Sequence, residues 1–109
     1  MFPTYLTHKN GQGLVSNYLN STMMAQTWGK PFLMFETNTA SCGGFPGISD
    51  TFASALWAVD YGLQMANSNF TGALLHAGGQ NVSYNVRIIV LRMVRSELTP
   101  RAIFIAIHR

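Results

Sequence analysis

The sequence predicts an α/β protein with a parallel sheet, on two observations. Helical spacing alternates with short apolar runs, which gives a helix over 13–28, a strand over 31–36, a helix over 51–67 and a strand over 70–79. Such alternation is typical of right-handed strand–helix–strand crossovers. The composition is 48% hydrophobic and only 10% charged, against about 25% charged in typical domains. We therefore expect the 109-residue chain to be a segment of a larger α/β protein.

The first helix and strand are read from residues 13–36. The helix GLVSNYLNSTMMAQTW has helical spacing at Leu14, Tyr18, Leu19, Met23 and Thr27. It ends at the Gly-Lys-Pro sequence of residues 29–31. PFLMFE then follows as a short apolar and aromatic run with turn signals on both sides. This pattern predicts a strand buried on both faces of a parallel sheet.

Residues 37–49 form a predicted loop of mostly small and polar residues, and a loop this long is usually kept for function. Ser49 or Asp50 is placed to cap the following helix. That helix, residues 51–67, is expected to bury the stripe Phe52, Leu56, Val59 and Leu63, with Asp60 off the stripe. Four further residues are predicted to be helix core: Trp57, Met23, Met24 and Met65.

Charge is distributed unevenly along the chain, whose net charge is +3. All five arginines lie in the last 23 residues, and the remainder is nearly neutral. This predicts a boundary near Asn85, with a body over 1–85 and a separate basic and apolar tail over 86–109. Because the net positive charge is confined to the tail, we do not expect nucleic-acid binding. The apolar runs of the tail are shorter than the ~20 residues that span a bilayer, so no membrane partner is expected, with an interfacial helix left as the alternative.

The N-terminus lacks the basic start and apolar core of a secretory signal. Three Asn-x-Ser/Thr sequons, at Asn20, Asn69 and Asn81, are nevertheless compatible with a secreted ancestor. The single cysteine, Cys42, cannot form an internal disulfide and gives no indication of compartment. The three histidines are too scattered to predict a metal site.

Two ionisable residues end the two predicted strands, Glu36 the first and His76 the second. In parallel α/β folds, catalytic and binding groups collect at the carboxyl ends of strands. Glu36 and His76 are therefore candidates for an active-site rim. The alternative is that Glu36 only opens the loop and accepts hydrogen bonds from backbone amides there.

The stretch GKPFLMFETNTASCGGFPGISDTFASALWAVDYGLQMANSNFTGALLHAGGQNVSYN resembles fungal glycoside hydrolase family 79, the β-glucuronidase-like relatives of heparanase. The resemblance runs from about residue 2 to 85 and is densest over 29–85. It implies a fragment of a (β/α)₈ TIM barrel, about strands 7 and 8 with flanking helices. The activity implied is that of a retaining β-glycosidase with a glucuronide-containing substrate, without cofactor, in an extracellular parent protein.

By this resemblance Glu36 is the catalytic nucleophile, and the acid/base glutamate of the family is absent from the chain. The implied substrate-binding residues are Asn38, Ser41, Cys42, Gly43, Gly44, His76, Gly78, Gly79 and Tyr84. Simpler alternatives stay open: a turn cap for Asn38, loop turns for the glycines, strand-end hydrogen bonding for His76 and packing for Tyr84. A reactive Cys42 is not expected, because no basic neighbour lowers its pKa.

We therefore expect a glycosidase fragment that is inactive alone, since no catalytic pair can be assembled from its four acidic residues. The alternative is a non-enzymatic chain, either a relic or a small interaction protein with a basic tail.

Overall fold

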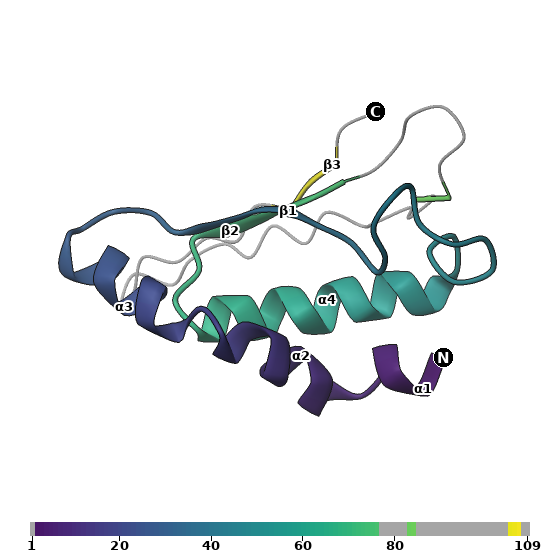
Figure 1. Ribbon diagram of the computed structural model, residues 1–109, viewed down its shortest axis with the longest axis horizontal. Helices are drawn as coiled ribbons and strands as arrows, with labels where there is room; N and C mark the ends of the chain where they lie inside the picture. Colours follow the sequence, from purple (N-terminus) through teal and green to yellow (C-terminus); the bar gives the residue numbers. More distant parts are fainter. Residues whose placement is uncertain (1, 77–82, 85–104, 108–109) are drawn as a thin grey trace.

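The structure is a computed structural model that describes residues 2–76, 83–84 and 105–107 (Figure 1). Its elements are α1 (Phe2–Tyr5), α2 (His8–Ser16), α3 (Leu19–Thr27), β1 (Leu33–Thr37), α4 (Phe52–Asn67), β2 (Gly72–Leu75) and β3 (Ile105–Ile107). The strands lie in the order β1-β2-β3, and both pairs are parallel. The predicted mixture of helices and parallel strands is confirmed for this part of the chain. A barrel fragment stays a prediction.

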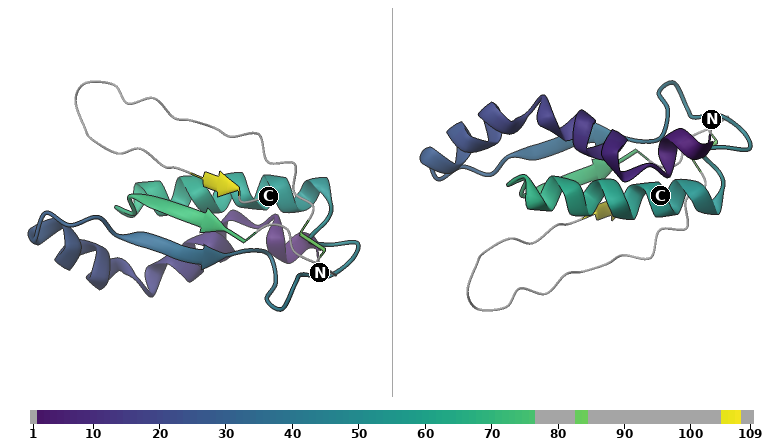
Figure 2. Two further views of the ribbon diagram at one scale, coloured as in Figure 1. Left: turned by 90° about the horizontal axis from the view of Figure 1, so that it is seen from above. Right: turned by 90° about the horizontal axis from the view of Figure 1, so that it is seen from below.

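The molecule has two layers, with α2 and α4 side by side along one face of the sheet (Figures 1 and 2). The core lies between the layers and takes side chains from both. Its buried members are Val15, Trp57, Ala58, Tyr61, Met65, Phe70, Ala73 and Leu75. β1 and α3 lie toward one side of this arrangement, while β2 lies above α4 (Figure 2).

The predicted helix over 13–28 is wrong in its extent, because α2 begins at His8 and a break separates it from α3. At the break the side-chain Nδ2 of Asn17 donates to the Leu14 carbonyl. An asparagine side chain competes in this way with the backbone hydrogen bonds that would continue the helix. The residues that the apolar spacing predicts to be buried are also not the buried ones. Within these helices the buried residues include Val15 and Thr22, whereas Met23 and Met24 are about half exposed, contrary to prediction.

The helix α4 has nearly its predicted bounds, but the opposite face is buried. Phe52 is 78% exposed, and Leu56 and Leu63 also lie outside the core. The buried face is Ser54, Trp57, Ala58, Tyr61, Gly62 and Met65. This face carries two aromatic rings, Trp57 and Tyr61, which stack at a centroid distance of 5.1 Å, whereas the predicted stripe carries only Phe52. Trp57 and Met65 are core residues, as predicted.

The start of α4 also differs from the prediction. Its N-cap is Thr51, with no capping hydrogen bond from the side chain, so neither Ser49 nor Asp50 is the cap. The hydroxyl of Ser49 is instead used inside the preceding loop.

The two predicted strands differ in burial. β2 is buried almost throughout, as expected of a central strand. In β1 only Met34 packs against the core, whereas Leu33 is 45% and Phe35 76% exposed. The prediction that this strand is buried on both faces is therefore wrong, because β1 is an edge strand among the described strands and Leu33 and Phe35 lie on the face that no described helix covers.

Three residues of the predicted tail, Ile105–Ile107, form β3 and pair with Ala73–Leu75 of β2. Residues 85–104 and 108–109 lie outside the described residues. The boundary near Asn85 stays a prediction. No helix in the described part of the chain is long and apolar enough to cross a membrane.

Candidate functional site

Glu36 and His76 lie at the same edge of the sheet. Thr37 is paired with Leu75, and the His76 amide donates to the Thr37 carbonyl at 3.1 Å, so the ends of β1 and β2 are held level. The Nδ1 of His76 lies 3.7 Å from Oε1 of Glu36. The Glu36 side chain is 74% exposed and that of His76 49%. The structure thus places two ionisable groups together at the carboxyl ends of neighbouring parallel strands, and their roles stay predictions.

A bulge in β1 sets the direction of Glu36. Met34 is paired with Ala73, but Thr37 is paired with Leu75, so β1 has one residue more than β2 between the two pairs. Ala73 and Leu75 both face the helices and are buried in the core. Thr37 therefore takes the helix-facing position that regular alternation would assign to Glu36. The carboxylate is left exposed at the end of the strand.

Asn38 connects the two strand ends. Its Nδ2 donates to the His76 carbonyl, and its Oδ1 accepts from the Thr39 amide at 2.7 Å. The side chain therefore acts as a cap on the turn that follows β1, one of the two roles that the sequence left open. No hydrogen bond to Glu36 occurs among these contacts.

The loop after β1 is fixed by Ser49, whose residue is fully buried. Its Oγ accepts a hydrogen bond from the Thr39 hydroxyl at 2.8 Å and another from the Phe45 amide at 3.0 Å. Sequence analysis assigned Ser49 to a helix cap and did not single out Thr39. The only available signal was a pair of small hydroxyl residues at the two ends of a long loop.

Gly44 is enclosed by this loop and has a φ of +80°. A Cβ at this position would lie 2.8 Å from Cβ of Ser49 and 2.8 Å from Cε1 of Tyr84. Gly43 and Cys42, next to it, also have positive φ angles, of 92° and 56°. The tight path of the backbone therefore requires glycine at position 44.

Tyr84 contacts both the loop after β1 and His76 at the end of β2. It is 6% exposed, its hydroxyl donates to the Ala40 carbonyl, and its ring meets His76 edge-on at 5.4 Å. The neighbouring Ser83 amide donates to the Gly43 carbonyl at 2.6 Å. These contacts attach the segment after β2 to the loop after β1. Of the two roles considered for Tyr84, packing and contact with substrate, the structure shows packing. A contact with substrate stays a prediction.

The other predicted site residues are placed less fully. Ser41 and Cys42 are exposed in the loop, and the Ser41 carbonyl accepts from the Gly44 amide at 3.2 Å. Gly78 and Gly79 lie outside the described residues. Among those that the structure describes, no cluster of three or more His, Cys, Asp or Glu side chains could hold a metal ion.

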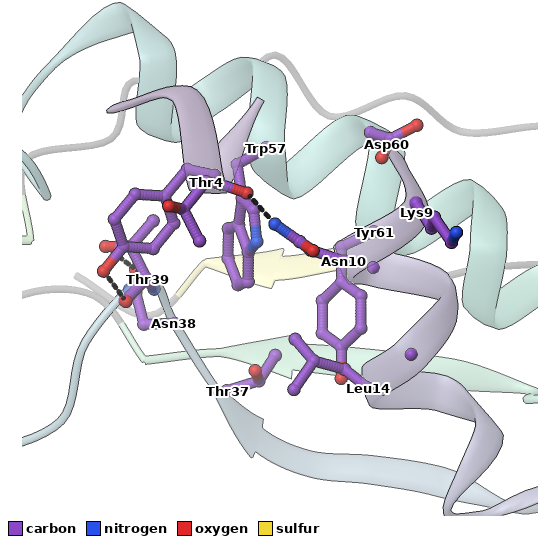
Figure 3. A pocket seen from close by; sticks show the side chains of 13 residues that line it. Thr4, Lys9, Asn10, Leu14, Thr37, Asn38, Thr39, Trp57, Asp60 and Tyr61 are labelled. Carbon is purple, nitrogen blue, oxygen red and sulfur yellow. Dashed lines mark hydrogen bonds between the residues drawn. The ribbon is translucent and has the colours of Figure 1, made fainter. Parts of the chain in front are cut away.

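A cavity of about 600 Å³ lies on the helix side of the β1 end, bounded by α1, α2 and α4 (Figure 3). Its walls combine the rings of Trp57 and Tyr61 with the polar side chains of Asn10, Thr37 and Asn38. Burial raises the pKa of Tyr61, and the neighbouring Tyr18 adds to the effect. Glu36 does not line this cavity.

Asp60, which lines the cavity, belongs to a second ionisable pair on the helix layer. Nδ1 of His8 lies 2.7 Å from Oδ1 of Asp60 and links α2 to α4. Gln12 contacts the other ring nitrogen of His8 at 3.1 Å. Asp60 is therefore already engaged away from the Glu36 edge.

Comparison with known proteins relates part of the sequence to fungal β-glucuronidases. Over 58 residues, or 53% of the chain, the sequence is 40% identical to a β-glucuronidase of Aspergillus niger. Over 48 residues, or 44% of the chain, it is 42% identical to a β-glucuronidase of Neurospora crassa. The matches cover only 10% and 9% of these two proteins. No family model and no solved structure matches the chain. The chain is thus related in part to fungal glycosidases and spans about a tenth of these curated relatives.

Proposed function

We propose that the chain is part of the catalytic barrel of a retaining β-glucuronidase of glycoside hydrolase family 79, with Glu36 as nucleophile. The observation that carries this proposal is the position of Glu36, exposed at the carboxyl end of a parallel strand and 3.7 Å from His76 on the next strand. Strand ends of this kind hold the catalytic residues of (β/α)₈ enzymes. The partial identity to two β-glucuronidases supports the same assignment.

The chemistry requires a carboxylate with free access to the anomeric carbon. In the proposed reaction a carboxylate oxygen of Glu36 attacks that carbon, the glycosidic C–O bond breaks, and an acid protonates the leaving oxygen. The same acid, now a base, then activates the water that hydrolyses the glycosyl ester. Because the bulge leaves the Glu36 carboxylate outside the helix-facing core, such an approach is open to it.

We propose that the acid/base comes from elsewhere in the parent protein. In retaining enzymes the two carboxyl groups are about 5–5.5 Å apart. Asp60 is paired with His8 on the helix layer, Asp50 precedes α4, and Glu97 lies outside the described residues. The chain alone is therefore expected to be inactive.

The proposed substrate is a glucuronide-containing glycan or glycoside. The loop of residues 41–44 has positive φ angles at Cys42, Gly43 and Gly44, and successive backbone amides in such a turn can form a concavity that binds an anion such as the sugar carboxylate. Ser41, Cys42, Gly43 and the residues after His76 are proposed to line this subsite. The three sequons lead us to propose an extracellular parent enzyme.

The direct test is an assay of the 109-residue chain with an aryl β-glucuronide, next to its Glu36→Gln variant. The proposal expects turnover by neither chain, and turnover by a full-length parent enzyme in which Glu36 is kept. Turnover by the isolated chain that is lost in Glu36→Gln would show that an acid within this chain completes the site. Turnover by the parent with Glu36→Gln would remove Glu36 as nucleophile.

A further inference from the structure

The cavity of about 600 Å³ on the helix side of the β1 end takes no part in the proposed chemistry. Its volume falls in the range of about 300–1,000 Å³ that small-molecule sites occupy. Thr37 lies in its wall, because the bulge gives this residue the helix-facing position, whereas Glu36 and His76 do not line it. The cavity is therefore a candidate binding site separate from the strand-end edge.

Two buried side chains present unpartnered polar groups at this cavity. Trp57 and Tyr61 line it and are only 7% and 4% exposed. No hydrogen bond between described residues involves the indole N–H of Trp57 or the hydroxyl of Tyr61. Among the described residues, Ser54 Oγ alone is both enclosed and without a hydrogen-bond partner, so both groups reach accessible space. Figure 3 shows the indole nitrogen on the side of Asn10 and the phenol oxygen beside Leu14, both of which line the cavity.

The wall that α2 contributes includes two glycines inside the helix, Gly11 and Gly13. Glycine is less favourable than alanine in a helix interior. A Cβ at position 13 would meet nothing within 4 Å, so packing does not require glycine there. Helical side chains lean toward the preceding turn, so a side chain at position 13 would lie over Lys9 and Asn10, which also line the cavity. Glycine at position 13 therefore keeps this side of the cavity open.

The charges at the cavity are balanced. Lys9 and Asp60 both line it, one of each sign, and Oδ1 of Asp60 is contacted by Nδ1 of His8 at 2.7 Å. A charged ligand would be attracted by one of the two lining side chains and repelled by the other. The cavity is therefore better matched to a neutral ligand.

The uncharged polar groups around the cavity are of mixed kind. The Trp57 N–H can only donate a hydrogen bond, whereas the hydroxyls of Tyr61 and Thr37 can donate and accept. Oδ1 of Asn10 is an acceptor, and its Nδ2 already donates to the Thr4 carbonyl at 2.8 Å. Each hydroxyl of a sugar both donates and accepts, and the C–H groups of a sugar ring can contact aromatic side chains. A sugar therefore suits this combination of groups.

We propose that this cavity binds a small neutral sugar, with the indole of Trp57 and the hydroxyl of Tyr61 as its buried hydrogen-bonding groups. The site goes beyond the proposed function. It is separate from the proposed uronide subsite, and it does not depend on Glu36 acting as a nucleophile, because Glu36 does not line the cavity.

The test uses the full 109-residue chain and ligand-observed NMR with glucose, galactose, mannose, xylose, N-acetylglucosamine and cellobiose as neutral probes. We expect saturable binding of one or more of these sugars, with a Kd below about 10 mM. Glucuronic acid should bind more weakly than the best neutral probe, by about threefold or more. Failure of every neutral probe to bind, or a preference for glucuronic acid at this cavity, would overturn the proposal.

Gly13→Phe is the variant that fills the cavity. It should raise the Kd of the best probe about tenfold or more, because the new ring would occupy open space over Lys9 and Asn10. Gly13→Ala controls for helix propensity, and Ser21→Phe adds the same ring at an exposed position of α3 outside the cavity wall. Both controls should stay within about twofold of the original Kd. An equal Kd for Gly13→Phe and Ser21→Phe would show that the sugar does not bind in this cavity.

Tyr61→Phe keeps the ring and removes the hydroxyl. Because this hydroxyl has no partner among the described residues, stability at neutral pH should change little, while the Kd should rise about threefold to tenfold. Thermal unfolding and the NMR titration measure the two effects separately. Lower stability with an unchanged Kd would mean that the hydroxyl serves the fold, and it would contradict the assignment.

Glu36→Gln distinguishes the cavity from the strand-end edge, and it should leave the Kd of the neutral sugar unchanged. A Kd that rises with Glu36→Gln but not with Gly13→Phe would place the sugar at the strand ends and overturn the cavity site. Sugar binding that depends on Gly13, in a protein whose parent enzyme keeps its turnover with Glu36→Gln, would leave the cavity site standing and remove only the enzymatic proposal.

Discussion

The Nδ1 of His76 lies 3.7 Å from Oε1 of Glu36, at the ends of two parallel strands that are kept level by the bond from the His76 amide to the Thr37 carbonyl. The two side chains are 40 positions apart in the sequence. Their proximity follows from the crossover of β1, α4 and β2, and from the bulge that leaves Glu36 outside the helix-facing side of β1. The proposed chemistry depends on this edge being held in place by the loop beside it.

Replacing Gly44 by alanine should destabilise the chain more than replacing Gly29. Both glycines have positive φ angles, which costs a residue with Cβ about 1–2 kcal/mol. At position 44 the new Cβ would also meet Ser49 and Tyr84 at 2.8 Å, which adds about 1–3 kcal/mol, whereas at position 29 nothing lies within 4 Å. Urea unfolding measures both variants. Equal losses would show that the enclosure of Gly44 is not real.

Ser49→Ala should destabilise the chain by about 1–3 kcal/mol, because the Thr39 hydroxyl and the Phe45 amide lose their acceptor in a buried place. Ser54→Ala is the matched control. The Ser54 hydroxyl is buried without a hydrogen-bond partner among the described residues, so its removal should be neutral or stabilising. Thermal unfolding of the two variants compares them, and the reverse ranking would contradict the loop assignment.

Asn38→Ala should loosen the junction between the strand ends, since the His76 carbonyl and the Thr39 amide both lose a partner. We expect a loss of about 1–2 kcal/mol, together with faster amide exchange at Thr39. Asn20→Ala, at an exposed position of α3, serves as the control and should change stability little. Unchanged exchange at Thr39 in Asn38→Ala would show that the cap is not formed in solution.

Stability should fall in alkaline solution partly through Tyr61. Burial, with a smaller contribution from Tyr18, raises its pKa above the usual value of 10.0. The unfolded chain therefore ionises first, and the stability that the neutral phenol contributes is present below about pH 10 and is lost as the pH rises through the folded pKa. Denaturant unfolding from pH 8 to 11 should show a steeper decline for the original chain than for Tyr61→Phe. Equal slopes would contradict the burial of the hydroxyl.

The order of elements could be predicted from sequence because turn residues bound each short apolar run, as at positions 29–31 before β1. The buried face of α4 could not be predicted. The helix carries apolar residues on two faces, and the choice depends on which aromatic rings reach the sheet. The wrongly expected burial of β1 has a similar cause, since LMFET is equally compatible with a central strand and with an edge strand.

The candidate site was predictable only in part. The sequence predicts that Glu36 and His76 lie at the same edge of the sheet, because parallel strands bring their carboxyl ends together. The bulge before Thr37 has no sequence signal, since no glycine marks it. Ser49 was assigned to a helix cap because small hydroxyl residues serve both purposes, and only its burial shows which purpose it serves.

The most direct test of the nucleophile assignment uses the parent enzyme, with this segment in its full barrel, and the variant Glu36→Ala. Without azide, turnover of an activated aryl β-glucuronide should fall by several orders of magnitude, about 10⁴-fold or more, while the melting temperature changes little. Added azide should occupy the space of the lost carboxylate and restore cleavage, with NMR showing a glucuronyl azide of inverted anomeric configuration. Near-normal turnover in Glu36→Ala, or a rescued product of retained configuration, would contradict the assignment of Glu36 as nucleophile.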